Sequence, residues 1–244
     1  MPSQRVELSG VGKLVRRHDP DRFLTALFAP APARETLFVL YAFNHELARA
    51  REAVREPMMA LIRLQWWREV LDGARPAHEV ATPLGAALDA GRLDPADLLP
   101  LIDAREAEAT EITSLSEWCH YILHSAGGLA VAAGRSLGAA GPALDAIRGY
   151  GAAYGAAGTL RSAPLLAHQA RTVLPPGIPS ETLAAQGRAW LDDAARIAIP
   201  RPTLAAALPA TLARRDLRRL GQPIRPRGVA DRLAVLSAWL RGRP

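Results

Sequence analysis

His120 and His124 are the residues whose types and spacing most directly suggest chemistry, because they lie four apart beside Cys119. Residues four apart in a helix share one face, and imidazole and thiolate groups ligate transition metals. Cys119 lies about 100° around such a helix from His120, and the sequence has no second Cys/His pair with ligand spacing. We therefore predict no metal site here and interpret both histidines as ordinary hydrogen-bonded residues.

Glu52 and Glu56 form a second candidate, since carboxylates four apart in a helix can grip Mg²⁺ together. Glu56 precedes Pro57, however, and a residue before proline is disfavoured in the α region. We expect Glu56 to leave the helix, so that the two carboxylates no longer share a face.

Two further motifs are better explained by packing than by binding. Trp66 and Trp67 are adjacent, so in a helix they point about 100° apart and cannot make one stacking platform for nucleobases. The glycine-rich run "GYGAAYGAAGTL" (149–160) follows no predicted strand, which argues against a phosphate-cradling loop. We predict core packing for the tryptophans and close helix contact for the glycines.

Helices must position all of these residues. Alanine, leucine and arginine dominate, aromatic residues make up 5%, and no stretch alternates polar and apolar residues over a strand's length. Asp19-Pro20 and Ser114 with Glu117 read as helix starts. We predict one all-α domain over 1–244, with 1–17 as a flexible N-terminal segment. The predicted helices cover 21–29, 33–55, 58–73, 84–90, 95–110, 115–138, 143–169, 180–197, 203–220 and 229–241.

Charge and cysteine content limit the setting without fixing the function. The net charge of +6 favours anionic partners and concentrates in 13–22 and 213–228. Cys119 is the single cysteine, which fits a reducing compartment, and no signal peptide is apparent. The uncharged run 118–134 is too short and polar for a membrane span. We predict a cytoplasmic protein, peripheral at the inner membrane at most, and no nucleic-acid partner, because no nucleic-acid-binding module is recognised.

Together, the ordered motifs resemble the squalene/phytoene synthase family of head-to-head prenyltransferases. They are "HDPDRFLTALFAPAPARETLFVLYAFNHELARAREAV", "EPMMALIRLQWWREVLDG" and, much later, "YGAAYGAAGTLRSAP" and "ARTVLP". The resemblance covers about residues 18–175. It implies a single-domain helix bundle of the terpenoid-synthase type with a central cavity. It also implies two Asp-rich motifs on facing helices, which hold the Mg²⁺ that withdraws charge from a departing pyrophosphate.

Measured against that family, the acidic motifs are degenerate. The first should follow Tyr41, but Ala48 and Arg49 occupy its positions and only Glu52 keeps a carboxylate. The second should follow Arg161, where Ser162 and Leu166 stand instead. Losing even one preorganised electrostatic group can cost about 10²–10³ in rate. The substrate-binding residues that the resemblance implies are Tyr41, Asn44, His45, Glu52, Tyr154, Arg161 and Arg171.

The resemblance therefore implies a noncatalytic protein without a cofactor. This degenerate pattern is similar to a branch of the family that includes a respiratory-complex assembly factor. The implied partners are an isoprenoid lipid or prenyl diphosphate and a protein of a membrane respiratory complex. The alternative is an active prenyltransferase that joins two prenyl diphosphates with displaced Mg²⁺ ligands. Its candidate carboxylates are Glu46, Glu52, Asp103, Glu106 and Asp145.

Overall fold

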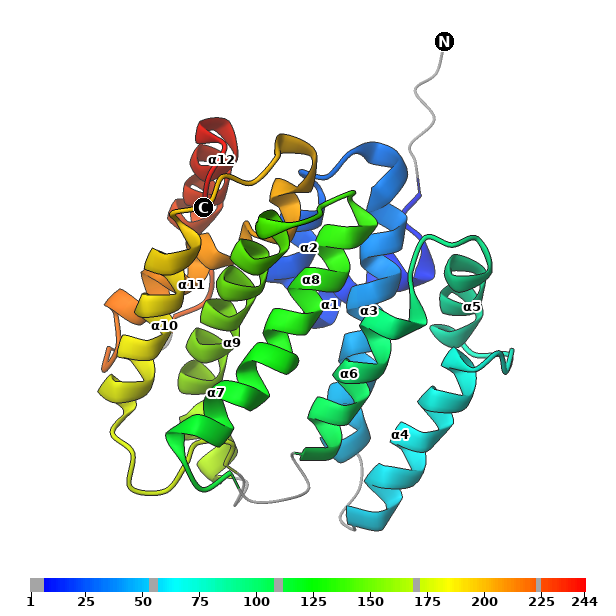
Figure 1. Cartoon of the computed structure of the whole chain (residues 1–244), viewed down its shortest axis with the longest axis horizontal. Helices are drawn as coiled ribbons and strands as arrows, with labels where there is room; N and C mark the ends of the chain where they lie inside the picture. Colours follow the sequence, from blue (N-terminus) through cyan, green and yellow to red (C-terminus); the bar gives the residue numbers. More distant parts are fainter. Residues whose placement is uncertain (1–6, 53–56, 108–111, 169–171, 223–224) are drawn as a thin grey trace.

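The computed structural model describes residues 7–52, 57–107, 112–168, 172–222 and 225–244 (Figure 1). In these ranges the chain forms twelve α-helices and two 3₁₀ helices, which confirms the predicted all-α class. The α-helices are α1 (Gly10–His18), α2 (Pro20–Ala26), α3 (Arg34–Glu52), α4 (Pro57–Leu71), α5 (Ala81–Asp89), α6 (Pro95–Ala107), α7 (Leu115–His124), α8 (Ala126–Ser136), α9 (Pro142–His168), α10 (Ser180–Ala194), α11 (Pro209–Arg218) and α12 (Val229–Arg241). The 3₁₀ helices are η1 (Ala31–Ala33) and η2 (Arg201–Ala206). No described helix is long and apolar enough to cross a membrane.

Helix α9 is the structural centre, flanked by α8 and α10 along its length (Figure 1). Its glycines allow the α8 backbone to come close. A Cβ built on Gly151 would lie 2.7 Å from the Ala126 carbonyl oxygen, and one on Gly155 would lie 2.5 Å from the Ala126 Cβ. The predicted role of the glycine-rich run in close helix packing is thereby confirmed for Gly151 and Gly155.

The N-terminal prediction is wrong from Gly10 onward, because 10–18 form α1 instead of a flexible segment. The Ser9 hydroxyl accepts a hydrogen bond from the Gly12 N–H at 3.0 Å and caps the helix. Val11 and Val15, one turn apart, are buried on the main core. Two valines in a basic nine-residue stretch were too weak a periodic signal to predict this helix.

Two other boundaries differ from those predicted. The single helix expected over 115–138 is broken at Ser125, where ψ is −80° and the hydroxyl donates to the Tyr121 carbonyl at 2.7 Å. Such a side-chain bond competes with the helical ladder. The helix expected over 203–220 instead comprises η2 and α11, because Pro209 has no N–H and suits the first turn of a new helix.

Asp231 anchors the start of α12. Its carboxylate accepts from the Gly228 N–H at 3.0 Å and from Arg215 Nε at 2.8 Å. Burial alone would raise the pKa of Asp231, but these two partners, together with the charge of Arg227, hold the pKa below its ordinary value. The ionised form therefore stabilises the folded state.

We expect Asp231→Asn to lower the free energy of unfolding by about 1 kcal/mol at neutral pH, the typical value of a lost helix cap. A carboxylate with a lowered pKa in the folded state contributes stability above its unfolded pKa of about 3.9 and loses it as the pH falls. Urea unfolding from pH 7 down to pH 3 should show the two proteins converging in acid. A difference that is constant with pH would contradict the assignment.

Candidate functional site

The positions expected of the two acidic motifs meet in one pocket of about 360 Å³. Ala48 comes from α3, while Ser162 and Leu166 come from α9. The pocket is completed by residues from the α1–α2 junction, α2, α6, α7 and α8. Its lining residues are Asp19, Arg22, Asn44, Ala48, Arg105, Tyr121, Ile122, Ser125, Ala126, Tyr154, Gly155, Gly158, Thr159, Ser162, Leu166 and Val173.

Helical spacing explains how α9 lines this pocket. Tyr154, Gly158, Ser162 and Leu166 follow one another at intervals of four residues, so they form a stripe on one side of the helix. Gly158 leaves open space along that stripe, because a Cβ built there meets no atom within 4 Å. A side chain at position 158 would therefore project into the pocket.

A largely buried ion pair lines the pocket. The Asp19 carboxylate accepts from Arg22 Nη1 at 2.8 Å and from the Arg22 N–H at 3.1 Å. The Arg22 guanidinium lies 4.8 Å from the Tyr154 ring centroid and 5.8 Å from that of Tyr41. Burial alone would lower the pKa of Arg22, but the charge and hydrogen bond of Asp19, together with Tyr154 and Tyr41, outweigh it and raise the pKa. Arg22 is therefore a permanent cation at the pocket.

Arg105 supplies a second cation from α6. Its Nη2 donates to Asn44 Oδ1 at 3.4 Å and its Nη1 to the Tyr121 hydroxyl at 3.5 Å. The charged residues of the lining are Arg22, Arg105 and Asp19, so the net charge of the lining is +1. The sequence did not point to Arg105, because nothing in its predicted helix indicates which side faces a pocket. It also indicated only a helix cap at Asp19.

The other residues predicted to bind substrate are dispersed. Asn44 and Tyr154 line the pocket, whereas Tyr41 is buried beneath Arg22 and His45 stacks on His18 with ring centroids 4.4 Å apart. Burial raises the pKa of Tyr41 and of Tyr154, so both hydroxyls stay protonated. Arg171 and the side chain of Glu52 lie outside the described residues.

The described lining does not fit a Mg²⁺ ion. Asp19 is its single carboxylate and is already paired with Arg22. Among the described residues, no three His, Cys, Asp or Glu side chains are grouped so that they could hold a metal. The other candidate carboxylates whose side chains the structure describes are engaged or distant. Glu46 pairs with Arg49, Asp103 and Glu106 both pair with Arg68, and Asp145 lies in the first turn of α9.

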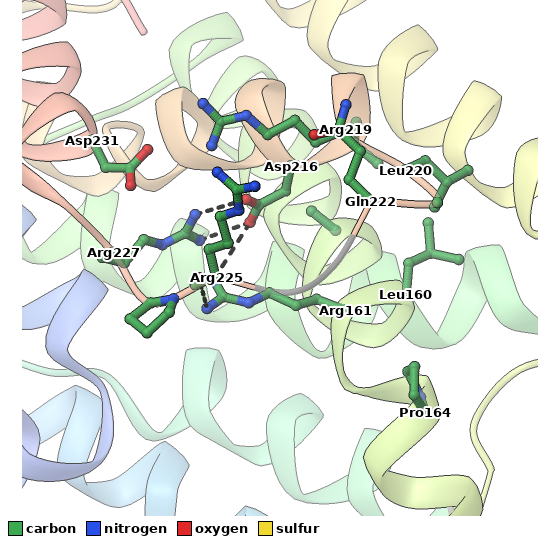
Figure 2. Close-up of a pocket in the computed structure, with 14 residues that line it drawn as sticks. Leu160, Arg161, Pro164, Asp216, Arg219, Leu220, Gln222, Arg225, Arg227 and Asp231 are labelled. Atoms are coloured by element: carbon green, nitrogen blue, oxygen red, sulfur yellow. Dashed lines mark hydrogen bonds and ion pairs between the residues drawn. The ribbon is translucent and has the colours of Figure 1, made fainter.

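Arg161 does not share this pocket with Ser162. It lines a second pocket of about 460 Å³ on another side of α9, with Leu160 and Pro164 beside it and residues 219–222 and 225–227 opposite (Figure 2). Its guanidinium donates to the Arg225 carbonyl at 3.2 Å and lies 3.8 Å from Asp216. Position 161 is one residue, and so about 100°, from 162, which explains the separation.

A chain of polar contacts connects the two pockets. The Tyr154 hydroxyl donates to Asp21 at 3.3 Å, and Asp21 pairs with Arg227 at 2.9 Å. Arg227 makes a bidentate pair with Asp216, with both N···O distances 2.7 Å (Figure 2). Burial alone would lower the pKa of Arg227, but the bonds to Asp216 and Asp21 raise it. The charge of Arg227 is therefore balanced by carboxylates of the protein itself.

His120 and His124 are stacked with ring centroids 3.9 Å apart, and His124 Nδ1 contacts the His120 carbonyl at 2.8 Å.

Trp67 is buried and packs edge-on against Phe43, with ring centroids 5.3 Å apart. The predicted packing role of the tryptophan pair is confirmed for Trp67.

Comparison with known proteins gives consistent results. The squalene/phytoene synthase family profile matches residues 15–178. Assembly factor 6 of NADH dehydrogenase (ubiquinone) complex I from Bos taurus is 36% identical over 98 residues, which are 38% of this chain and 29% of that protein. The Drosophila melanogaster homolog of this factor is 30% identical over 190 residues, 71% of this chain and 54% of that protein. The chain thus spans about half or less of the length of these relatives.

Solved structures agree on the fold. A dehydrosqualene synthase in complex with ligand superimposes with a TM-score of 0.78 at 14% identity, covering 95% of this chain and 94% of that one. Squalene synthase HpnC from Alicyclobacillus acidocaldarius gives a TM-score of 0.68 at 15% identity over 96% and 94% of the two chains. The predicted terpenoid-synthase-like bundle is confirmed.

Proposed function

Since the chain belongs to the squalene/phytoene synthase family, we propose that it holds an isoprenoid lipid in the pocket between α3 and α9 without joining prenyl diphosphates. The observation that carries this proposal is the lining of that pocket. Ala48, Ser162 and Leu166, at the positions where the resemblance implies metal-binding carboxylates, line it together with the cations Arg22 and Arg105.

The chemistry of the lining favours an amphiphile. Arg22 and Arg105 bring positive charge that attracts a diphosphate or another polar head. Ile122, Ala126 and Leu166 offer apolar surface for part of a prenyl chain. Because no grouped carboxylates among the described residues could hold Mg²⁺, we expect the charge of a leaving pyrophosphate not to be neutralised by metal, and hence binding without turnover.

We expect farnesyl diphosphate to raise the melting temperature of the protein, with no pyrophosphate release in the presence of Mg²⁺. Gly158→Leu should weaken this binding at least about tenfold, because the new side chain enters the pocket, while helix propensity at that position improves. Ala167→Leu adds the same side chain to an exposed part of α9 outside the lining and serves as the matched control. Thermal shift and a pyrophosphate assay on one sample measure both quantities.

Each outcome of this test has a distinct meaning. Mg²⁺-dependent pyrophosphate release would establish the alternative, an active prenyltransferase with displaced ligands. Equal stabilisation of wild type and Gly158→Leu would place the lipid elsewhere, and no stabilisation of the wild type would end the lipid proposal.

We further propose a role in assembling a membrane respiratory complex, with a protein of that complex as partner. The partial sequence identity of this chain to complex I assembly factor 6 from several animals supports this role. In the source organism, deletion of the gene should reduce assembled complex I on native gels, and the wild-type gene should restore it. Unchanged complex I after deletion would contradict the role. Restoration by Gly158→Leu would separate assembly from lipid binding.

A further inference from the structure

Helix α12 lies at the edge of the bundle (Figure 1). The exposed fractions of its side chains show that it carries an apolar stripe on its outer side. Val229, Leu233, Leu236 and Leu240 are 71%, 57%, 39% and 62% exposed. Their spacing of four, three and four residues places them within about 60° of one another around the helix. Single exposed apolar residues are ordinary on a protein surface, but four on consecutive turns of one helix form a continuous seam.

Contacts between α12 and the rest of the protein keep the apolar stripe facing outward. Val235 and Ala238 on the inner side of α12 are buried with Leu204, Leu208 and Leu212. Trp239 packs against Phe28, with ring centroids 5.6 Å apart, and under the Arg201 guanidinium at 4.4 Å. Together with the Asp231 anchor, these contacts fix the rotation of α12. The stripe is therefore preorganised and cannot turn inward.

Positive charge borders the seam on both sides. Arg232 and Arg241 are exposed and flank the stripe around the helix. The one acidic residue of α12, Asp231, is buried and paired with Arg215. A narrow stripe with this spacing is typical of a helix-to-helix seam, where flanking charges select the partner. A second copy of this chain would set arginines against arginines, which disfavours self-association.

We infer that α12 docks an acidic amphipathic helix of a protein partner. The apolar side of the partner helix covers the stripe, and its carboxylates lie beside Arg232 and Arg241. The inference deepens the proposed assembly role by giving the chemical class of the partner. It does not depend on the lipid pocket. A seam of four residues buries little area, so the complex is weak and transient.

The probes are two synthetic helices of about three heptads, both with Leu at the two core positions of each heptad. One carries Glu at the flanking positions and the other carries Lys. We expect the full protein to bind the Glu peptide with a micromolar Kd in fluorescence anisotropy, at least about tenfold tighter than the Lys peptide. Arg232→Glu with Arg241→Glu should reverse that preference, and Leu233→Gln with Leu236→Gln should abolish binding of both peptides.

The matched control is Ile62→Gln, which removes an apolar side chain of similar exposure (54%) from α4 and should leave peptide binding unchanged. Binding of neither peptide, or equal binding of both, would overturn the inference. Binding only to vesicles containing phosphatidylglycerol would assign the stripe to a lipid surface, and a dimer lost in the Leu233/Leu236 variant would assign it to a second copy. Farnesyl diphosphate stabilisation measured on the same variants should be unchanged, which separates failure here from failure of the lipid proposal.

Discussion

Replacing Arg227 with methionine is expected to lower the free energy of unfolding by about 3 kcal/mol, because it removes the cation shared by two largely buried carboxylates and leaves Asp216 only its longer contact with Arg161. The side chains of Asp21 and Asp216 are 13% and 19% exposed, and both pair with Arg227. Removing one partner of such a group strands the remaining charges in a poorly solvated site. In a chain of this size the melting temperature should fall by roughly 6–12 °C.

Arg225→Met is the control for this prediction. Arg225 lies two residues away, is exposed, and its side chain has no ion pair among the described residues. Its carbonyl, which accepts from Arg161, is retained in the variant. Urea unfolding should show a change within about 0.5 kcal/mol for Arg225→Met. Equal losses in the two variants would mean that net charge, and not the buried pairing, determines stability here.

Gly151→Ala is expected to destabilise the protein by about 2 kcal/mol although it adds a single methyl group. The new Cβ would lie 2.7 Å from the Ala126 carbonyl oxygen and 3.2 Å from the Gly127 Cα, and it would also meet Ala130. These atoms belong largely to the α8 backbone, which cannot rotate away as a side chain can. The cost of overpacking therefore exceeds the gain of about 1 kcal/mol in helix propensity.

Gly158→Ala makes the same chemical change on the same helix without the collision, because a Cβ at Gly158 meets no atom within 4 Å. We expect it to be neutral or to stabilise the protein by up to about 1 kcal/mol. The comparison by urea denaturation isolates the approach of α8 from helix propensity. Similar effects of both substitutions would show that the α8 and α9 backbones separate readily.

The helix bundle was predictable because the residues that begin and end a helix lie in short stretches of the sequence. Asp19-Pro20 and Ser114 both cap helices as expected, and glycines with positive φ follow α4, α5, α8, α11 and α12 within three residues. Positions Ala48, Ser162 and Leu166 could be placed together because the family motifs fix which helices face each other.

What could not be predicted depends on contacts between distant segments. Arg105 joins the pocket through Asn44, which is 61 residues away in the sequence. Which of Arg161 and Ser162 faces the pocket with Ala48 depends on the rotation of α9 about its own axis, which packing of α8, α10 and α11 decides. Residue types alone do not encode that rotation.

The pair formed by Asp21 and Arg227 joins residues 206 positions apart. During synthesis, at about 5–20 residues per second, Asp21 is made roughly 10–40 s before its partner. Throughout that interval the carboxylate on α2 has no Arg227 to neutralise it, so the ionic contact that connects α2 to α11 is completed only after residue 227 has been added. The newly made α2 therefore gains this contact only when the segment that follows α11 has been synthesised.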